Sequence, residues 1–162
     1  MQKTILVFSD SHGATFNMSE VIKKYPDAEC VIHLGDGVED TKYLTLPPTT
    51  GLLTVRGNCD AFSNEPKELF AELCGLWFLI CHGDAYGVKH GIERYENYAV
   101  KRGADIALFG HTHSKYKNEI KTDGKTVYVF NPGSISLPDM NRPSYGVIKI
   151  DGGRAELVHK TV

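Results

Sequence analysis

The sequence lacks any long hydrophobic run, and this absence argues against a membrane-spanning helix. Such a helix needs about 18 consecutive apolar residues, and no segment of the 162-residue chain approaches that length. The opening stretch, MQKTILVFSDSHG, contains too short an apolar segment for a cleaved signal peptide. We therefore expect a cytoplasmic protein with no membrane partner.

Cysteine is scarce and shows no pairing pattern. The chain has four cysteines without CxxC spacing, and this density is far below that of secreted domains held together by disulfides. We expect reduced thiols that mostly fill the core. They are Cys30, Cys59, Cys74 and Cys81.

The chain also lacks an excess of positive charge. Its formal net charge is −2, whereas proteins that capture nucleic acid through its phosphates need a basic face. Nucleic acid is therefore not a favoured partner. Internal repeats, low-complexity tracts and linker-like stretches are absent too, so a single domain over residues 1–162 is the simplest organisation.

What the sequence does contain is an alternation of short apolar runs, polar loops and helical stretches, which predicts an α/β fold. The runs are rich in Ile, Leu, Val and Phe, as strands buried on both faces usually are. The clearest expected strands are residues 4–8, 30–34, 51–55, 77–81 and 106–109. Helices are expected at residues 15–25 and about 87–102, where apolar groups recur three and four positions apart.

Two further segments need a separate interpretation. Residues 66–73 fit either a helix or the first arm of a hairpin with 76–81, and the intervening Gly75 favours the hairpin. In the last third of the chain, apolar segments alternate with turn sequences, which predicts an antiparallel meander forming a second sheet. These segments are 126–133, 144–150 and 155–162.

Polar residues suited to chemistry fall just past the ends of the expected strands. In an open α/β sheet the carboxyl ends of neighbouring strands share one rim, so residues distant in sequence can meet there. Glycine beside most of them allows sharp turns and close approach of the backbone. The residues are Asp10, His12, Asp36, Asn58, His82, His111 and His113.

This set contains two carboxylates, one amide and four imidazoles, and no thiolate. Such ligands suit Mn²⁺, Zn²⁺, Fe²⁺ or Ni²⁺ better than calcium or structural zinc. Seven ligands are too many for one ion, so we expect two ions that share a bridging carboxylate. Two such ions form an electropositive pocket that attracts a phosphate ester and can activate a bridging water.

Each of these residues also has an ordinary structural explanation. A lone histidine in a loop is more often a surface or structural residue, and GD and GN are common turn sequences. The metal hypothesis depends on their joint occurrence after successive strands. The other histidines are left out: His33 is expected inside the protein, where it could support a ligand, and His90 and His159 are expected to be exposed.

With those residues in place, the sequence resembles the calcineurin-like metallophosphoesterases, and more closely their small YfcE-type phosphodiesterases. The resemblance covers nearly the whole chain through the ordered motifs DSHG, LGD, GNCD, HG and GHTH, followed by NPGS. It implies a four-layer αββα sandwich of two mixed β-sheets flanked by helices. It further implies two divalent ions, with Mn²⁺ favoured, and hydrolysis of a phosphodiester or monoester by a hydroxide that bridges them.

The resemblance also implies a role for each residue of the set. Asp36 would bridge the two ions, and Asn58 and His111 would also contact the substrate phosphate. The ligands would be Asp10, His12 and His113 for one ion, and Asn58, His82 and His111 for the other.

Two positions depart from the family pattern. Cys59 stands where larger relatives have the histidine thought to protonate the leaving group. A thiol with a pKa of about 8.5 is a poorer general acid at neutral pH, so we expect good leaving groups or protonation by metal-bound water. Asp84 stands where close relatives often have histidine, and it is either a carboxylate that orients a liganding imidazole or a solvated loop residue.

A different class of function stays open, because the retromer subunit Vps29 resembles these enzymes but has a degraded metal site. The intact ligand set argues against a non-catalytic interaction scaffold of that kind. A small phosphoester is the expected substrate, and residues 85–91 or 136–144 are candidates for gripping the rest of it. Its identity, the native metal and a homo-oligomeric state are left open.

Overall fold

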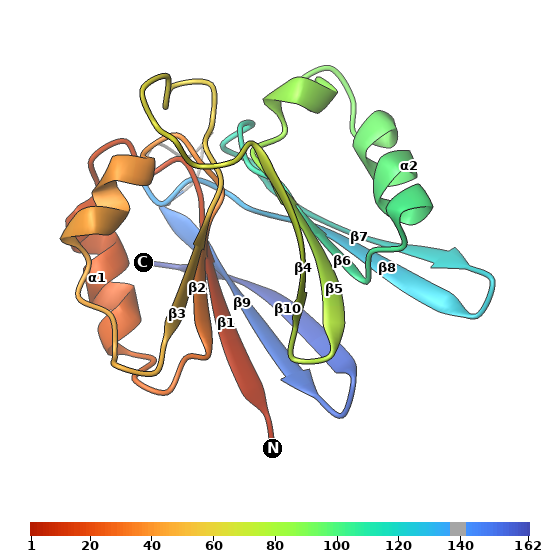
Figure 1. Ribbon diagram of the computed structural model, residues 1–162, viewed down its shortest axis with the longest axis horizontal. Coiled ribbons are helices and arrows are strands. Elements are labelled where there is room, and N and C mark those ends of the chain that lie inside the picture. The colour runs from red at the N-terminus through yellow and green to blue at the C-terminus, as the bar shows by residue number, and fades with distance from the viewer. Residues whose placement is uncertain (137–141) are drawn as a thin grey trace.

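The computed structural model describes residues 1–136 and 142–162, and it places them in two mixed five-stranded sheets that pack face to face (Figure 1). The first sheet has the order β10-β9-β1-β2-β3, and the second has the order β4-β5-β6-β8-β7. The strands of the first sheet are β1 (Lys3–Phe8), β2 (Cys30–His33), β3 (Gly51–Thr54), β9 (Ser144–Asp151) and β10 (Arg154–Thr161). Those of the second are β4 (Glu68–Leu73), β5 (Leu76–Cys81), β6 (Ile106–Leu108), β7 (Lys115–Thr122) and β8 (Lys125–Pro132).

The helices lie on the outer faces of the two sheets, which confirms the expected layering (Figure 1). The alternation of side chains along each strand builds three buried clusters between successive layers. Val7 and Ile80 belong to the cluster between the sheets. Leu6 packs in the cluster beneath α1 (Thr15–Lys23), and Leu79 packs in the cluster beneath α2 (Glu93–Arg102).

Most of the expected elements are present within a few residues of the expected bounds. The hairpin preferred for residues 66–81 is confirmed, because β4 and β5 pair antiparallel with Leu73 opposite Leu76. The second helix was expected too early: it begins at Glu93. Residues 84–92 instead form a short 3₁₀ helix, η2 (Asp84–Tyr86), and turns in which Gly87 and Gly91 take positive φ.

The prediction that the last third forms one separate sheet is wrong. The strands β7 and β8 complete the second sheet, whereas β9 and β10 join the first, with Ile148 of β9 opposite Ile5 of β1. Both β8 and β9 are buried along most of their length, whereas β7 alternates between exposed and half-buried positions. The two buried strands therefore take interior places in different sheets, with β7 and β10 at the edges.

The parallel strands place the polar loops on one rim. In the first sheet β1, β2 and β3 run parallel, and in the second sheet β5, β6 and β8 do. Their carboxyl ends all point to the upper edge of the molecule in Figure 1. Neither α-helix among the described residues has the length and apolar character that a bilayer crossing requires.

All four cysteines are free thiols, and no two of them form a disulfide. Cys30 and Cys81 are buried and Cys74 is half-buried, in agreement with the expected core role. Cys59 is the exception, because it is exposed on the loop after β3. That position leaves its thiol accessible at the functional rim.

Candidate metal centre

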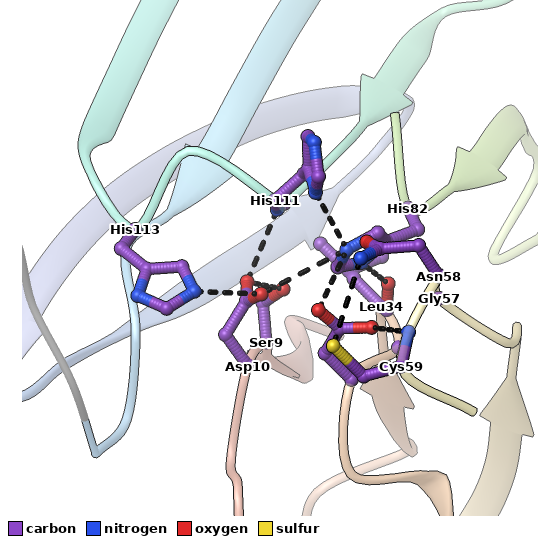
Figure 2. Close-up of polar contacts among 12 residues, drawn as sticks. Ser9, Asp10, Leu34, Gly57, Asn58, Cys59, His82, His111 and His113 are labelled. Carbon is purple, nitrogen blue, oxygen red and sulfur yellow. Dashed lines mark hydrogen bonds and ion pairs between the residues drawn. The ribbon is translucent and has the colours of Figure 1, made fainter. Parts of the chain in front are cut away.

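Six of the seven predicted ligands come together at this rim as two triads. Figure 2 shows Asp10, His82, His111 and His113 among them. Within each triad, one potential ligand atom of every residue lies within 4.8 Å of the others. The first triad is Asp10, His12 and His113, and the second triad is Asp36, His82 and His111. Each triad therefore offers one carboxylate and two imidazoles, a donor set that fits a borderline divalent ion.

An uncommon backbone conformation aims most of these side chains. Non-glycine residues rarely adopt positive φ because the Cβ atom clashes, and the cost is about 1–3 kcal/mol for each. Six described non-glycine residues adopt it; one is Cys74 in the β4–β5 turn, and the other five are predicted ligands. Those five are Asp10, His12, Asp36, His111 and His113, with φ between 40° and 70°. Strain concentrated at ligand positions indicates a functional centre.

Asp10 lies between the triads and is completely buried. Its Oδ2 accepts hydrogen bonds from the hydroxyl of Ser9 (2.5 Å) and the backbone N–H of His111 (3.1 Å). Its Oδ1 receives no hydrogen bond from a described residue, although Nε2 of His113 and of His82 lie 3.2 and 3.8 Å away. A buried carboxylate oxygen left without a partner is costly. A cation among these atoms would satisfy it, so the residues present fit a metal.

A backbone carbonyl fixes the orientation of His82. Its Nδ1–H donates to the carbonyl oxygen of Leu34 at 2.7 Å, and its Nε2 faces the carboxylate of Asp36 at 3.3 Å. Nδ1 of His111 lies 3.2 Å from the same Nε2. An outer hydrogen bond of this kind holds a liganding histidine in the tautomer whose other nitrogen is free to bind metal.

The charges of the centre stabilise one another. Burial alone would raise the pKa of Asp36 and lower that of His82, but their pairing outweighs burial, so the pKa of Asp36 falls and that of His82 rises. For Asp10, contacts with His113 and His82 likewise outweigh burial and lower its pKa. Burial, followed by the nearby His82, lowers the pKa of His111. Because the pKa of His82 is raised, a divalent ion would compete with a proton for its Nε2.

The predicted ligand Asn58 and Cys59, which stands at the position of the family's general-acid histidine, share the loop after β3 (Figure 2). The backbone N–H of Cys59 donates to Oδ1 of Asp36 at 2.8 Å, and Nδ2 of Asn58 lies 3.6 Å from Sγ of Cys59. Although Cys59 is exposed, partial desolvation by the surrounding loop, followed by the neighbouring carboxylate of Asp36, raises the pKa of its thiol. The thiol is therefore protonated at neutral pH but is a weak acid.

Asp84 makes no side-chain hydrogen bond or ion pair with the rest of the described chain. The group that orients His82 is the Leu34 carbonyl, not this carboxylate. Asp84 instead lines a small cavity beside Asn58. Of the two segments expected to grip the ester, the one at 136–144 falls largely on residues 137–141, outside the described residues.

Sequence reasoning missed the role of Asp60, the last residue of the GNCD motif. Its carboxylate accepts four backbone N–H groups and so joins the loop after β2 to the loop after β3. The donors are Asp36 (2.7 Å), Gly37 (2.9 Å), Val38 (3.2 Å) and Gly57 (2.8 Å). Aspartate in a turn sequence commonly accepts hydrogen bonds from nearby backbone, so the bond to the local loop could have been predicted. The sequence did not indicate the second loop that Asp60 also bonds.

The NPGS segment also has a positioning role that the sequence did not reveal. Nδ2 of Asn131 donates to the carbonyl of Gly110 at 3.1 Å and to the hydroxyl of Thr112 at 3.0 Å, which fixes the GHTH loop. The hydroxyl of Ser134 donates to the carbonyl of Asp10 at 2.8 Å. One segment therefore braces both loops that supply the first triad.

The three histidines left out of the ligand set have different environments. His33 is fully buried, as expected, and burial lowers its pKa to about 4. His90 is exposed, as expected, although it precedes α2. His159 is not exposed: its half-buried ring stacks on Phe130 with centroids 4.3 Å apart, and its Nε2 lies 2.8 Å from the carbonyl of Asn131.

A family model and two relatives of known sequence indicate the same protein family for this chain. A model described as the calcineurin-like phosphoesterase superfamily domain matches residues 4–153. The probable metallophosphoesterase YsnB of Bacillus subtilis is 31% identical over 153 residues, which cover 93% of this chain and 86% of that protein. Phosphodiesterase YfcE of Escherichia coli K12 is 24% identical over 173 residues, which cover 91% and 88%.

Solved structures agree at the level of the fold. A predicted phosphoesterase from Streptococcus pneumoniae TIGR4 superposes with a TM-score of 0.75 at 25% identity and covers 99% of both chains. Vacuolar protein sorting 29 (Vps29) from Cryptosporidium parvum superposes with a TM-score of 0.70 at 18% identity, over 98% of this chain and 97% of that one. The second likeness concerns the fold alone.

Proposed function

Because the chain belongs to the calcineurin-like phosphoesterase superfamily, we propose that it is a two-metal phosphodiesterase acting on a small phosphoester. The observation that carries the proposal is the convergence of two carboxylate–imidazole triads on one rim. The names of its relatives support it, since YsnB is called a probable metallophosphoesterase and YfcE a phosphodiesterase. The net charge of −2 favours a small ester over nucleic acid.

In this proposal Asp10, His12 and His113 would hold one divalent ion, and His82, His111 and Asn58 would hold the other, with Asp36 as a ligand shared between the two sites. Mn²⁺ is the favoured metal, and Zn²⁺, Fe²⁺ and Ni²⁺ suit the same ligands. When bound, two such ions supply an activated water as nucleophile and neutralise charge on the phosphoryl oxygens.

The protein's own groups position the ester and manage protons. The amide of Asn58 and the imidazole of His111 contact phosphoryl oxygens. The backbone N–H of Cys59 holds the Asp36 carboxylate in place at 2.8 Å. Since the pKa of the Cys59 thiol is raised, it donates a proton poorly at neutral pH, and the enzyme prefers esters with good leaving groups.

The test is reconstitution of chelator-treated protein with single metals. We expect Mn²⁺ to bind at two ions per chain and to restore hydrolysis of bis(p-nitrophenyl) phosphate. Double replacement of His82 and His113 by Ala gives the matched control, which should bind neither ion. No turnover with any of the four metals at full occupancy would contradict the proposal.

The alternative function, a non-catalytic interaction scaffold, has support only from the likeness in fold to Vps29. The complete triads and the buried Oδ1 of Asp10, which accepts no hydrogen bond from the described residues, favour a metal-using enzyme instead. Tight binding of a protein partner by a chain that showed neither stoichiometric metal nor turnover would favour the scaffold.

A further inference from the structure

A cavity of about 180 Å³ lies beside Asn58, on the loop next to the second triad. It is smaller than the ~300–1,000 Å³ pockets that enclose drug-sized ligands, so it suits one compact chemical group. Four charged residues line it: Arg56, Asp60, Lys67 and Asp84. Because Asn58 lines the same cavity and is a proposed phosphate contact, a group bound there would be attached to the phosphoester undergoing hydrolysis.

Arg56 has hydrogen-bonding capacity to spare. A guanidinium has five N–H donors, and the side chain of Arg56 makes one hydrogen bond in the described part of the chain, from Nη1 to the carbonyl of Ser63 at 3.2 Å. Its Nε is buried and has no acceptor there. That single bond ties Nη1 to the backbone at Ser63, while other N–H groups lack a partner among the described residues.

Lys67 is the second cation of the cavity. The backbone N–H of Arg56 donates to the carbonyl of Pro66 at 2.9 Å, which keeps the chain at Lys67 next to Arg56. Within the described residues the Lys67 ammonium forms no ion pair. Two cations without anionic partners therefore face the same small space.

The two carboxylates do not cancel these charges equally. Asp60 already accepts four backbone N–H groups, which compensate its charge. The formal charges of the four side chains sum to zero, but Asp84 is the only one of the two carboxylates left to offset Arg56 and Lys67, so the two cations are in local excess over uncommitted carboxylates. That excess matches one compact anionic group and is too small to attract a long polyanion.

We propose that this cavity binds a second phosphate group carried by the organic part of the phosphoester substrate. Arg56 meets its oxygens with the planar guanidinium, Lys67 adds a point charge, and Asp84 limits the positive excess. The inference rests on the proposed phosphodiesterase function and narrows it to substrates with two phosphates separated by a short linker.

The test compares two p-nitrophenyl phosphodiesters that share one leaving group. One has a butyl ester, and the other has a 3-phosphonopropyl ester that places a second anion within reach of the cavity. We expect the Mn²⁺-loaded protein to favour the phosphonopropyl substrate in kcat/KM by at least about tenfold, the effect of one charge-assisted hydrogen bond. Added NaCl should reduce this preference.

Substitutions in the cavity then assign the preference to its residues. Lys67 is exposed. Lys67→Met should lower the ratio of kcat/KM for the phosphonopropyl substrate to that for the butyl substrate several-fold. Lys67→Glu should bring this ratio below one. Arg56→Lys should lower it while keeping the charge, because the planar fork is lost. The matched control is Lys121→Met, at an exposed lysine of β7 that does not line the cavity.

Calorimetry gives a readout independent of turnover. Propane-1,3-diphosphonate should bind the Mn²⁺-loaded protein at least about tenfold more tightly than butylphosphonate, and Lys67→Glu should abolish the difference. Hydrolysis of both esters without a preference, or a preference unchanged by Lys67→Glu, would overturn the second-phosphate site and leave the phosphodiesterase intact. Hydrolysis of neither ester with any metal would instead overturn the proposed function.

Discussion

The two triads have the same composition but are built differently. In the first, His12 is exposed and His113 is half-buried, whereas in the second both Asp36 and His82 are buried. The second is also supported by the Leu34 carbonyl and, through the backbone, by Asp60. Similar ligands with different burial and support should hold their ions with different strength, so we expect the second ion to be the tighter of the two.

The largest expected effects come from two single variants, each of which removes one imidazole from one of the triads. His82→Ala should release the second ion and lower kcat/KM by more than the ~10–100-fold loss typical of outer-shell changes. His12→Ala should leave that ion bound while the first becomes labile. Metal analysis after gel filtration at limiting Mn²⁺ checks this, and equal retention by the two variants would contradict the asymmetry.

Residues that brace the triads should have an intermediate effect. Asp60→Asn should weaken mainly the second ion, by about 10–100-fold in affinity, since Asp60 is not itself a ligand. Asn131→Ala should weaken both ions, because Asn131 fixes the loop that carries His111 of the second triad and His113 of the first. Asp105→Asn is the control, because Asp105 also accepts a backbone N–H, from Trp77 at 2.7 Å, but lies outside both triads. Titration with a metal-sensitive dye measures each affinity, and equal weakening of both ions by Asp60→Asn would contradict its assignment to the second triad.

The dependence on pH should sharpen the contrast further. The pKa of His82 is raised above its ordinary 6.5, and its proton must leave before an ion binds. As the pH is lowered, the metal affinity of the second site should therefore begin to fall while the pH is still above 6.5. At lower pH the loss of affinity should approach about tenfold per pH unit. The pKa values of Asp10 and Asp36 are lowered, so these carboxylates stay ionised in this range. A metal affinity at the second site that stays unchanged between pH 8 and pH 6 would refute this.

The smallest effect is expected at Cys59. Cys59→His places a group with a pKa near neutrality beside the second triad, so turnover of esters with poor leaving groups should rise by up to about tenfold or somewhat more. Cys59→Ser serves as the control and should give no such rise. Unchanged rates for phenyl and alkyl esters in Cys59→His would show that leaving-group protonation is not limited by this residue.

Local patterns were sufficient to predict most of the strands and the polar residues that come together at the rim. Runs such as 4–8 and 77–81 are almost entirely apolar, and the polar residues follow them closely, so the rim could be deduced from the position of these residues just past the strand ends. The division of the last third between two sheets was not predictable in this way. It depends on the pairing of β9 with β1, across nearly the whole chain, for which turn sequences contain no signal.

The supporting residues were missed for the same reason. Asp60 and Asn131 act by bonding the backbone of loops far away in sequence, and a motif shows neither partner. His159 was expected to be exposed because it lies in a terminal strand, but that strand packs it on Phe130. Contacts of this kind depend on tertiary packing, which periodicity does not encode.

Anomalous diffraction from crystals of the Mn²⁺-loaded protein tests the central claim most directly. We predict two anomalous peaks at the rim, one bound by the first triad and one by the second, with the second keeping its occupancy longer under chelator. A single peak, or none at saturating Mn²⁺, would contradict a two-metal centre.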